Sequence, residues 1–279
     1  MLGSFVITAR EGLEASLILG IILAYLARTG NGGYARTVWA GAAAAIAASL
    51  AIGGAVFATV GELAEETEVV VEGLAMVLAA AVLTYMVIWM RHQASGLSAT
   101  LQGKVSAAVR SGSGLALFTL AFVAVLREGF ETALFLFAAA SASSPAETLV
   151  GGLLGLGAAV GLGYILYSGS RRLNLRAFFN VSGLLLILFA AGLLAHGVHE
   201  LEEAALLPVV VAKVWDLRWL LDDAQGLGSF LKALFGYNAD PSLGEVVSYF
   251  AYLAAALWYY LRPPAASLRL NHRAAKSAH

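Results

Sequence analysis

Seven stretches of this chain are apolar over about the length that crosses a bilayer, and little of the sequence lies outside them. A spanning helix needs about 20 mostly apolar residues. The seven stretches are residues 3–27, 38–60, 69–90, 114–140, 148–170, 177–199 and 244–261. Only 13% of all residues are charged, against about 25% in a soluble domain, so lipid must be the main solvent. We therefore predict an all-α polytopic membrane protein with seven transmembrane helices.

The composition also limits the partners and the chemistry. A net charge of −1 argues against nucleic acid as a partner. The chain has no cysteine, so a metal site in it must use carboxylate or imidazole ligands. The first apolar stretch lacks a basic leader and contains Arg10, Glu11 and Glu14. We therefore expect it to remain in the bilayer as the first helix rather than to be removed as a signal peptide.

The basic residues predict the orientation. Twelve of the seventeen Lys and Arg residues follow the first, third and fifth apolar stretches or lie in the C-terminal tail. By the positive-inside rule these segments are cytoplasmic, so the N-terminus is outside and the C-terminus inside a plasma (bacterial inner) membrane. The acidic residues lie within the spans or at the outer face, where they form a mouth that attracts cations.

One charged motif occurs twice. Residues 5–14 align without gaps on residues 122–131, and the motif reads Arg-Glu-Gly-Leu-Glu at 10–14 and Arg-Glu-Gly-Phe-Glu at 127–131. A weaker similarity joins residues 71–74 to 181–184, which chance between apolar helices also explains. A unit of three spans, duplicated and followed by a seventh, places the second unit upside down. The prediction is a 3+3 inverted repeat plus one extra helix, with a binding site where the halves meet.

Charges inside a span usually mark a pathway or a binding site. In each motif the two glutamates are three residues apart and the arginine precedes the second glutamate by four, so each arginine can support one carboxylate. The two motifs lie at similar depth, so the four carboxylates can meet. Their excess of negative charge favours a multivalent cation or protons, and two buried Arg–Glu pairs that only lock helices together are the structural alternative. The expected metal ligands are Glu11, Glu14, Glu128 and Glu131, supported by Arg10, Arg127, Gly12 and Gly129.

These motifs resemble the signature of the oxidase-dependent iron transporter family, the Ftr/Efe-type high-affinity iron permeases, in their short bacterial form. The resemblance extends over 72–73, 85–90, 196–203, 236–238 and 241–243, and covers the chain up to about residue 262. It implies an iron permease rather than an enzyme, with the four motif glutamates as translocation ligands. It implies iron, Fe²⁺ or Fe³⁺, as the transported substrate and no resident cofactor. It also suggests an extracytoplasmic iron oxidase or iron-binding protein as a partner.

We expect one transmembrane permease domain over residues 1–262 and a cytoplasmic tail over 263–279. Within the domain, repeat 1 covers about 1–92, repeat 2 about 114–200, an outer loop 201–243, and the seventh helix 244–261. In the loop, Trp215, Trp219 and the apolar run 230–235 predict an interfacial or re-entrant helix, with a docking surface for an oxidase as the alternative.

A second group of polar residues predicts an outer capture site. His196, His199 and Glu200 follow one another at i, i+3 and i+4 near the outer end of the sixth span. Further candidates for capture are Glu72, Glu203, Glu65 and Glu66. A hydrated helix end and ordinary solvated loops are the plain alternatives.

Two other functions remain open at this stage. A permease for manganese or lead uses the same kind of site. A membrane di-iron oxidase also uses carboxylates on facing helices, but such centres contain Glu-x-x-His, whereas both motifs here end in Glu.

Overall fold

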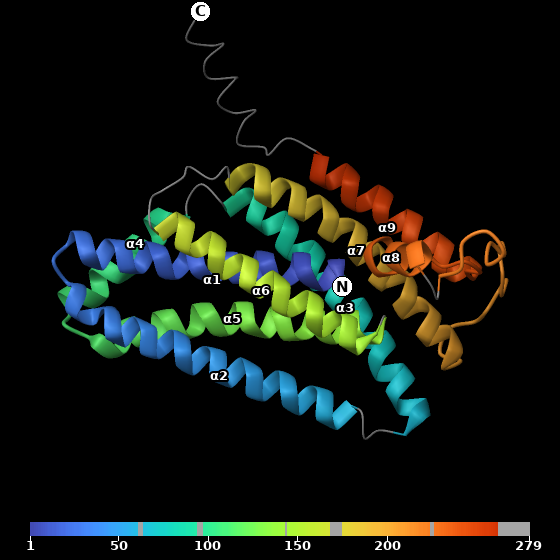
Figure 1. The fold of residues 1–279 in the computed structure, drawn as a ribbon, viewed down its shortest axis with the longest axis horizontal. Coiled ribbons are helices and arrows are strands. Elements are labelled where there is room, and N and C mark those ends of the chain that lie inside the picture. Colours follow the sequence, from blue (N-terminus) through green and yellow to red (C-terminus); the bar gives the residue numbers. More distant parts are fainter. Residues whose placement is uncertain (61–63, 94–96, 143, 168–174, 224–225, 262–279) are drawn as a thin grey trace, which may run out of the picture.

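The computed structural model describes residues 1–60, 64–93, 97–142, 144–167, 175–223 and 226–261, which form helices and one long irregular loop (Figure 1). No β-strand occurs in these ranges. The α-helices are α1 Leu2–Arg28, α2 Ala35–Val60, α3 Glu65–Gln93, α4 Leu97–Arg110, α5 Gly114–Ser141, α6 Pro145–Tyr167, α7 Leu175–Glu203, α8 Gly226–Phe235 and α9 Leu243–Leu261, with a short 3₁₀ turn, η1, at Gly32–Tyr34.

Each of the seven predicted spans coincides with a helix, namely α1, α2, α3, α5, α6, α7 or α9. Within the described residues, four segments are both long and apolar enough to cross a membrane: Gly32–Val60, Thr67–Met90, Pro145–Ile165 and Ala177–Glu203. Helices α1 and α5 carry the motif charges, and α9 has 19 residues with several tyrosines. The expected end of the fifth span, at 168–170, lies outside the described residues, as does the tail after residue 261.

Two shorter helices complete the fold. Helix α4 lies in the connection between the third and fourth spans, where the apolar pattern predicted none. Helix α8 confirms the helix expected over 230–235. Trp215 and Trp219, by contrast, lie in irregular backbone, and Trp219 is 80% exposed. The loop is held instead by backbone hydrogen bonds to the segment before α9, such as Leu217 N–H to Ala239 O at 2.8 Å.

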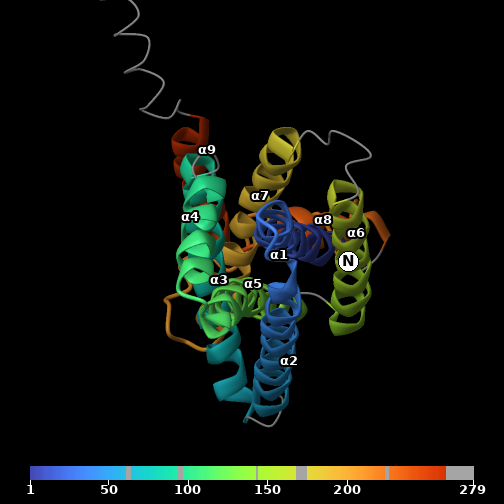
Figure 2. The ribbon, with the colours of Figure 1, turned by 90° about the vertical axis from the view of Figure 1, so that its left-hand side faces the viewer.

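Helix α1 lies at the centre of the molecule (Figure 2), where it contacts α4, α5, α6, α7 and α8. The most extensive helix contacts join α1 to α6, α2 to α5, and α3 to α7. Thus helices from the first part of the chain pack mainly against helices from the second part.

Glycine contacts in these pairs recur with constant spacing. Gly41 of α2 packs against the backbone of Phe118 in α5, and Gly151 of α6 packs against that of Met1 before α1. Two further pairs of contacts are related in the same way. The contact of Gly53 with Ala133 corresponds to that of Gly163 with Ser16. The contact of Ser49 with Gly129 corresponds to that of Ala159 with Gly12. In each matched pair of contacts, the residue number on α6 exceeds that on α2 by 110 (151 − 41). The residue number on α5 exceeds that of the corresponding residue in or just before α1 by 117 (118 − 1). The motifs have this last spacing too (127 − 10).

In the third helix pair, the corresponding contacts exchange α3 with α7. Gly73 of α3 packs against the backbone of Gly197 in α7, and Gly183 of α7 packs against Val87 of α3. Both correspondences have a spacing of 110 (183 − 73 and 197 − 87). This is the spacing of the weak similarity between residues 71–74 and 181–184, which therefore has a structural counterpart.

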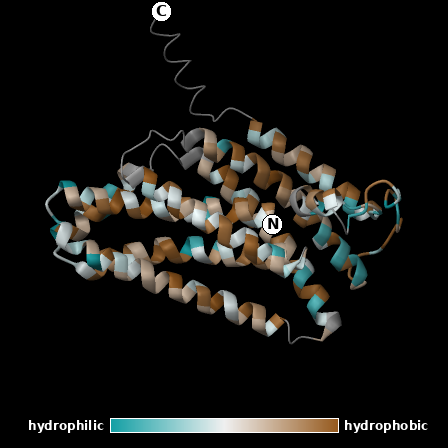
Figure 3. Ribbon diagram, in the orientation of Figure 1, coloured by the Kyte–Doolittle hydropathy of each residue, from teal (hydrophilic) through white to brown (hydrophobic). Residues whose placement is uncertain are grey.

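The outside of the bundle is apolar over most of its length. Hydrophobic residues cover the helices, while hydrophilic residues gather at the two ends of the long axis (Figure 3). Side chains such as Leu50 of α2 and Leu153 of α6 are 71% and 61% exposed. Such surfaces are covered favourably by lipid and unfavourably by water.

Candidate metal site

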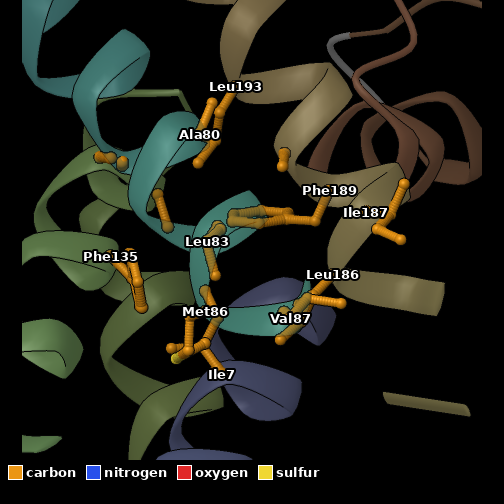
Figure 4. Packing of buried hydrophobic residues seen from close by; sticks show 14 of the residues in the cluster. Ile7, Ala80, Leu83, Met86, Val87, Phe135, Leu186, Ile187, Phe189 and Leu193 are labelled. Carbon is orange, nitrogen blue, oxygen red and sulfur yellow. The ribbon is translucent and has the colours of Figure 1, made fainter. Parts of the chain in front are cut away.

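The charged motifs lie between two hydrophobic clusters. One cluster joins α3, α5 and α7 with Ile7 of α1 (Figure 4). The other contains Ile18 and Ile22 of α1 together with Leu117 and Ala121 of α5. Residues 10–14 follow Ile7 and precede Ile18, and residues 127–131 occupy the corresponding place on α5. Apolar packing on both sides therefore holds the charged groups in the interior of the bundle.

The first motif is deeply buried. Arg10, Glu11 and Glu14 are 1%, 1% and 5% exposed. Arg10 Nη2 lies 3.2 Å from Glu14 Oε1, which confirms the expected i, i+4 pair, and its Nη1 lies 3.7 Å from Glu11 Oε1. The same Nη1 donates a weak hydrogen bond of 3.6 Å to the sulfur of Met86 in α3. Arg10 is thus enclosed by its two carboxylates and by α3.

The second motif is arranged differently. Arg127 donates hydrogen bonds from Nη2 at 2.6 Å and from Nε at 3.1 Å to Glu128 Oε1. Its Nε lies 3.5 Å from Glu131 Oε1, so the closest carboxylate is the adjacent residue and not the expected i+4 partner. The Arg127 side chain is 46% exposed, and its guanidinium lies over the ring of Trp89 in α3, 5.4 Å from the centroid.

Three of the four predicted carboxylates come together. Glu11, Glu128 and Glu131 each contribute one carboxylate oxygen, and these three oxygens lie within 4.8 Å of one another. No other group of His, Asp or Glu in the described residues meets this criterion. Glu14 is not part of the group and is engaged by Arg10 instead. The group is shared between the motifs, because one carboxylate comes from α1 and two come from α5.

The carboxylates retain acceptors that no protein donor satisfies. Among the described residues, the buried side-chain polar atoms without a hydrogen-bond partner all belong to the motifs. They are Arg10 Nε, both oxygens of Glu11, Glu14 Oε1, Glu128 Oε2 and Glu131 Oε2. Glu14 Oε1 and Glu11 Oε1 lie within ion-pair distance of Arg10, but neither receives a hydrogen bond. A buried carboxylate oxygen without a donor is costly, and each such cluster in a native protein calls for an explanation. Oxygen-only ligands of this kind suit hard or borderline metal ions.

The motif glycines let the helices approach. A Cβ atom on Gly12 would lie 2.7 Å from Ala159 Cβ in α6, and one on Gly129 would lie 2.7 Å from Ser49 Cβ in α2. Both distances are shorter than contacts between real Cβ atoms, so neither position accepts a side chain without movement. The predicted supporting role of Gly12 and Gly129 thus has a steric basis in the α1–α6 and α2–α5 contacts.

This contact supports a stability prediction. Gly129→Ala should lower the free energy of unfolding by about 1–3 kcal/mol, because the added methyl group overpacks the α2–α5 contact. Ser49→Gly in the same chain should recover part of this loss. The measurement is thermal unfolding of the purified protein in detergent. Gly54→Ala is the control, since nothing lies within 4 Å of a Cβ there; an equal loss in this variant would contradict the steric explanation.

His199 lies beside a carboxylate that the sequence pattern did not predict as part of the site. His199 Nδ1 lies 3.0 Å from Oε1 of Glu245, which is 3% exposed. Glu245 also accepts hydrogen bonds from the Ser242 N–H and from Asn238 Nδ2, while the Glu245 N–H donates to Ser242 Oγ. Ser242 and Glu245 thus form a capping box at the start of α9. The Ser-x-x-Glu spacing before an apolar run was the signal that could have found it.

The other capture candidates do not converge in the same way. The rings of His196 and His199 are 6.4 Å apart between centroids. Glu72 precedes Gly73, which packs against the Glu200 side chain, so these two acids share the α3–α7 contact. Glu203 is exposed, and the side chains of Glu65 and Glu66 are outside the described set. Their role in capture stays a prediction.

The outer loop pairs its cations internally. Lys213 lies 2.7 Å from Asp240, Lys232 lies 2.9 Å from Asp223, and Arg218 lies 2.6 Å from Asp216. Hydrogen bonds from Arg218 lower the pKa of the exposed Asp216 carboxyl to about 2. These positive charges are therefore partly neutralised at the predicted outer mouth.

Fold and site together define a helical membrane protein with a buried carboxylate cluster built by two copies of one motif. Its sequence matches the model of the Iron permease FTR1 family over residues 1–267. The chain belongs to this family.

Individual relatives agree with the family match. The chain is 38% identical over 262 residues to the ferrous iron permease EfeU of Yersinia pestis, which covers 93% of each chain. It is 38% identical over 264 residues to EfeU of Escherichia coli O6:H1, covering 94% of this chain and 96% of that protein. To EfeU of Shigella sonnei it is 37% identical over 272 residues, covering 97% and 99%. No solved structure matches the chain.

Proposed function

We propose that this protein imports ferrous iron across the plasma membrane through the carboxylate group Glu11, Glu128 and Glu131, with Glu14 in support. The observation that carries the proposal is the cluster of buried carboxylate oxygens without donors, contributed by both motifs. A divalent cation supplies what these oxygens lack. The relatives named ferrous iron permease favour Fe²⁺ over Fe³⁺ as the cargo.

The proposal includes the predicted topology. Seven helices span the membrane, with the N-terminus outside and the C-terminus inside, and the first six form an inverted repeat. The two constant spacings of the glycine contacts support the repeat. They fit a two-fold relation in which the α1–α6 pair corresponds to the α5–α2 pair, and in which α3 and α7 correspond to each other. Inverted repeats bind their substrate between the halves, where the shared carboxylates lie.

The ion is expected to enter from the acidic outer face. A cavity of about 20 Å³, enough for one water molecule, is lined by Ser4, His196 and Lys232 among others. Ser4 precedes Glu11 by about two turns of α1. A negative interior potential then favours inward movement by about 2.3 kcal/mol per charge per 100 mV. His196, His199, Glu200 and Glu72 are proposed as a capture route toward this cavity.

The alternatives differ in how well they fit the site. Manganese or lead would use the same oxygen ligands, so geometry does not separate them from iron. A di-iron oxidase is disfavoured because no histidine belongs to the carboxylate group in the described residues. An extracytoplasmic iron oxidase or iron-binding protein remains a proposed partner on the outer face.

Uptake into liposomes tests this function. Vesicles containing the purified protein should accumulate Fe²⁺ under anaerobic conditions, and competition by excess Mn²⁺ or Pb²⁺ measures which of the three ions the site prefers. Glu14→Ala should abolish uptake because it removes the partner of buried Arg10. Glu131→Ala should abolish uptake because it removes a proposed ligand. Undiminished uptake in both variants would contradict the assignment, and oxygen consumption by the iron-loaded protein would favour the oxidase.

A further inference from the structure

The two arginines occupy the same place in the motif but not in the structure. Arg10 is 1% exposed, and its ion pairs are 3.2 and 3.7 Å long. The Arg127 side chain is 46% exposed and binds Glu128 at 2.6 Å. Since the helix contacts around the motifs follow a two-fold relation, this difference is a real asymmetry of the site and needs a physical reason.

The partners of Arg127 are the proposed ligands themselves. Both carboxylates that it contacts, Glu128 and Glu131, belong to the three-carboxylate group, whereas the closest partner of Arg10 is Glu14, which does not. Two donors of Arg127 converge on one oxygen, Glu128 Oε1. A cation that uses this oxygen must first displace the guanidinium.

The surroundings of Arg127 allow such a displacement. Arg127 lies near the middle of α5, 13 residues after Gly114 and 14 before Ser141. A guanidinium facing hydrocarbon at this depth is unfavourable, so the displacement requires that water reaches the exposed side of Arg127. The face of Trp89, already 5.4 Å from the guanidinium carbon, offers a cation–π site when the carboxylates are occupied. Arg10 has no comparable space.

We propose that Arg127 is a tethered counter-cation that competes with iron for Glu128 and Glu131. This inference rests on the proposed function. In the empty site the guanidinium neutralises part of the excess charge. An entering Fe²⁺ displaces it toward Trp89 and water, and its return weakens the hold of the two carboxylates on the ion. No bond is formed or broken in this exchange. Arg127 therefore sets affinity and release, while Arg10 holds the first motif in place.

Equilibrium binding of Fe²⁺ to the purified full chain in lipid nanodiscs, without oxygen, tests this role. Arg127→Gln should bind Fe²⁺ at least about tenfold more tightly than the wild type, because a charge-assisted competitor is removed. Its turnover in liposomes should fall, since release slows. Lys213→Gln, which removes one positive charge from the outer loop, should leave the affinity for Fe²⁺ and the turnover in liposomes unchanged. Equal or weaker binding by a monodisperse Arg127→Gln protein would overturn the proposal.

Free guanidinium provides a readout that a structural role would not move. In Arg127→Ala, millimolar guanidinium should fill the vacated position and weaken Fe²⁺ binding several-fold, whereas the neutral analogue urea should have no effect. The wild type should respond to neither. If Arg127→Gln fails to fold, Arg127→Lys serves instead and should bind more tightly to a smaller extent. An insensitive Arg127→Ala protein would also count against the proposal.

The two proposals fail separately. If Fe²⁺ binding survives in Glu128→Gln, the carboxylate site itself is wrong. If binding is lost in Glu128→Gln but does not tighten in Arg127→Gln, the site stands and only the role of Arg127 is refuted.

Discussion

Replacing Glu128 by glutamine should lower iron uptake at least about 100-fold while the protein stays in the membrane. The side chain is 2% exposed, and its Oε2 has no protein donor. Glutamine keeps the shape but removes the charge and replaces an acceptor with a donor. Loss of groups that merely orient metal ligands already costs about 10–100-fold, so loss of a ligand should cost more. Glu11→Gln should behave alike, since both oxygens of Glu11 are without donors.

The measurement is initial uptake of radiolabelled iron by cells that carry equal amounts of each variant, judged by immunoblot of membranes. Glu147→Gln is the matched control, because this carboxylate is 49% exposed at the start of α6, where it forms an ion pair with the N-terminus. Glu128→Gln uptake above about a tenth of the wild-type rate would exclude Glu128 as a ligand.

Arg10→Gln should destabilise the fold by about 3–5 kcal/mol, the usual cost of breaking a buried ion pair from one side. The guanidinium is enclosed by Glu11, Glu14 and Met86, and its removal leaves two buried carboxylates without a counter-charge. Thermal unfolding in one detergent compares the variants. The double variant Arg10→Gln with Glu14→Gln should recover part of the loss, because one uncompensated charge disappears.

Arg127→Gln is the control for this second prediction. Its side chain is 46% exposed, whereas that of its closest partner Glu128 is 2% exposed. Removal of Arg127 therefore leaves one deeply buried carboxylate unpaired instead of two, and it should cost less than removal of Arg10. A loss of stability as large as that of Arg10→Gln would show that exposure does not separate the two arginines. The same result would weaken the displacement proposed for Arg127.

Local pattern was enough to predict the long helices, because a run of about 20 apolar residues has few other ways to satisfy its backbone in lipid. It missed α4, where the sequence is polar enough to be read as a connection. The pattern also missed Glu245, because its partners His199 and Asn238 belong to α7 and the outer loop. A contact of that kind depends on how separate segments pack.

The sequence by itself determined that two charged motifs lie in apolar helices, and that four carboxylates outnumber two arginines. Only the tertiary structure decided that Glu11 joins Glu128 and Glu131 while Glu14 is engaged by Arg10. It also decided that Arg10 is enclosed and Arg127 open. The physical reason is that residue type and spacing set charge and helical face, whereas burial and partners depend on the neighbouring helices. Two copies of one motif therefore differ, because α3 presents Met86 to one arginine and Trp89 to the other.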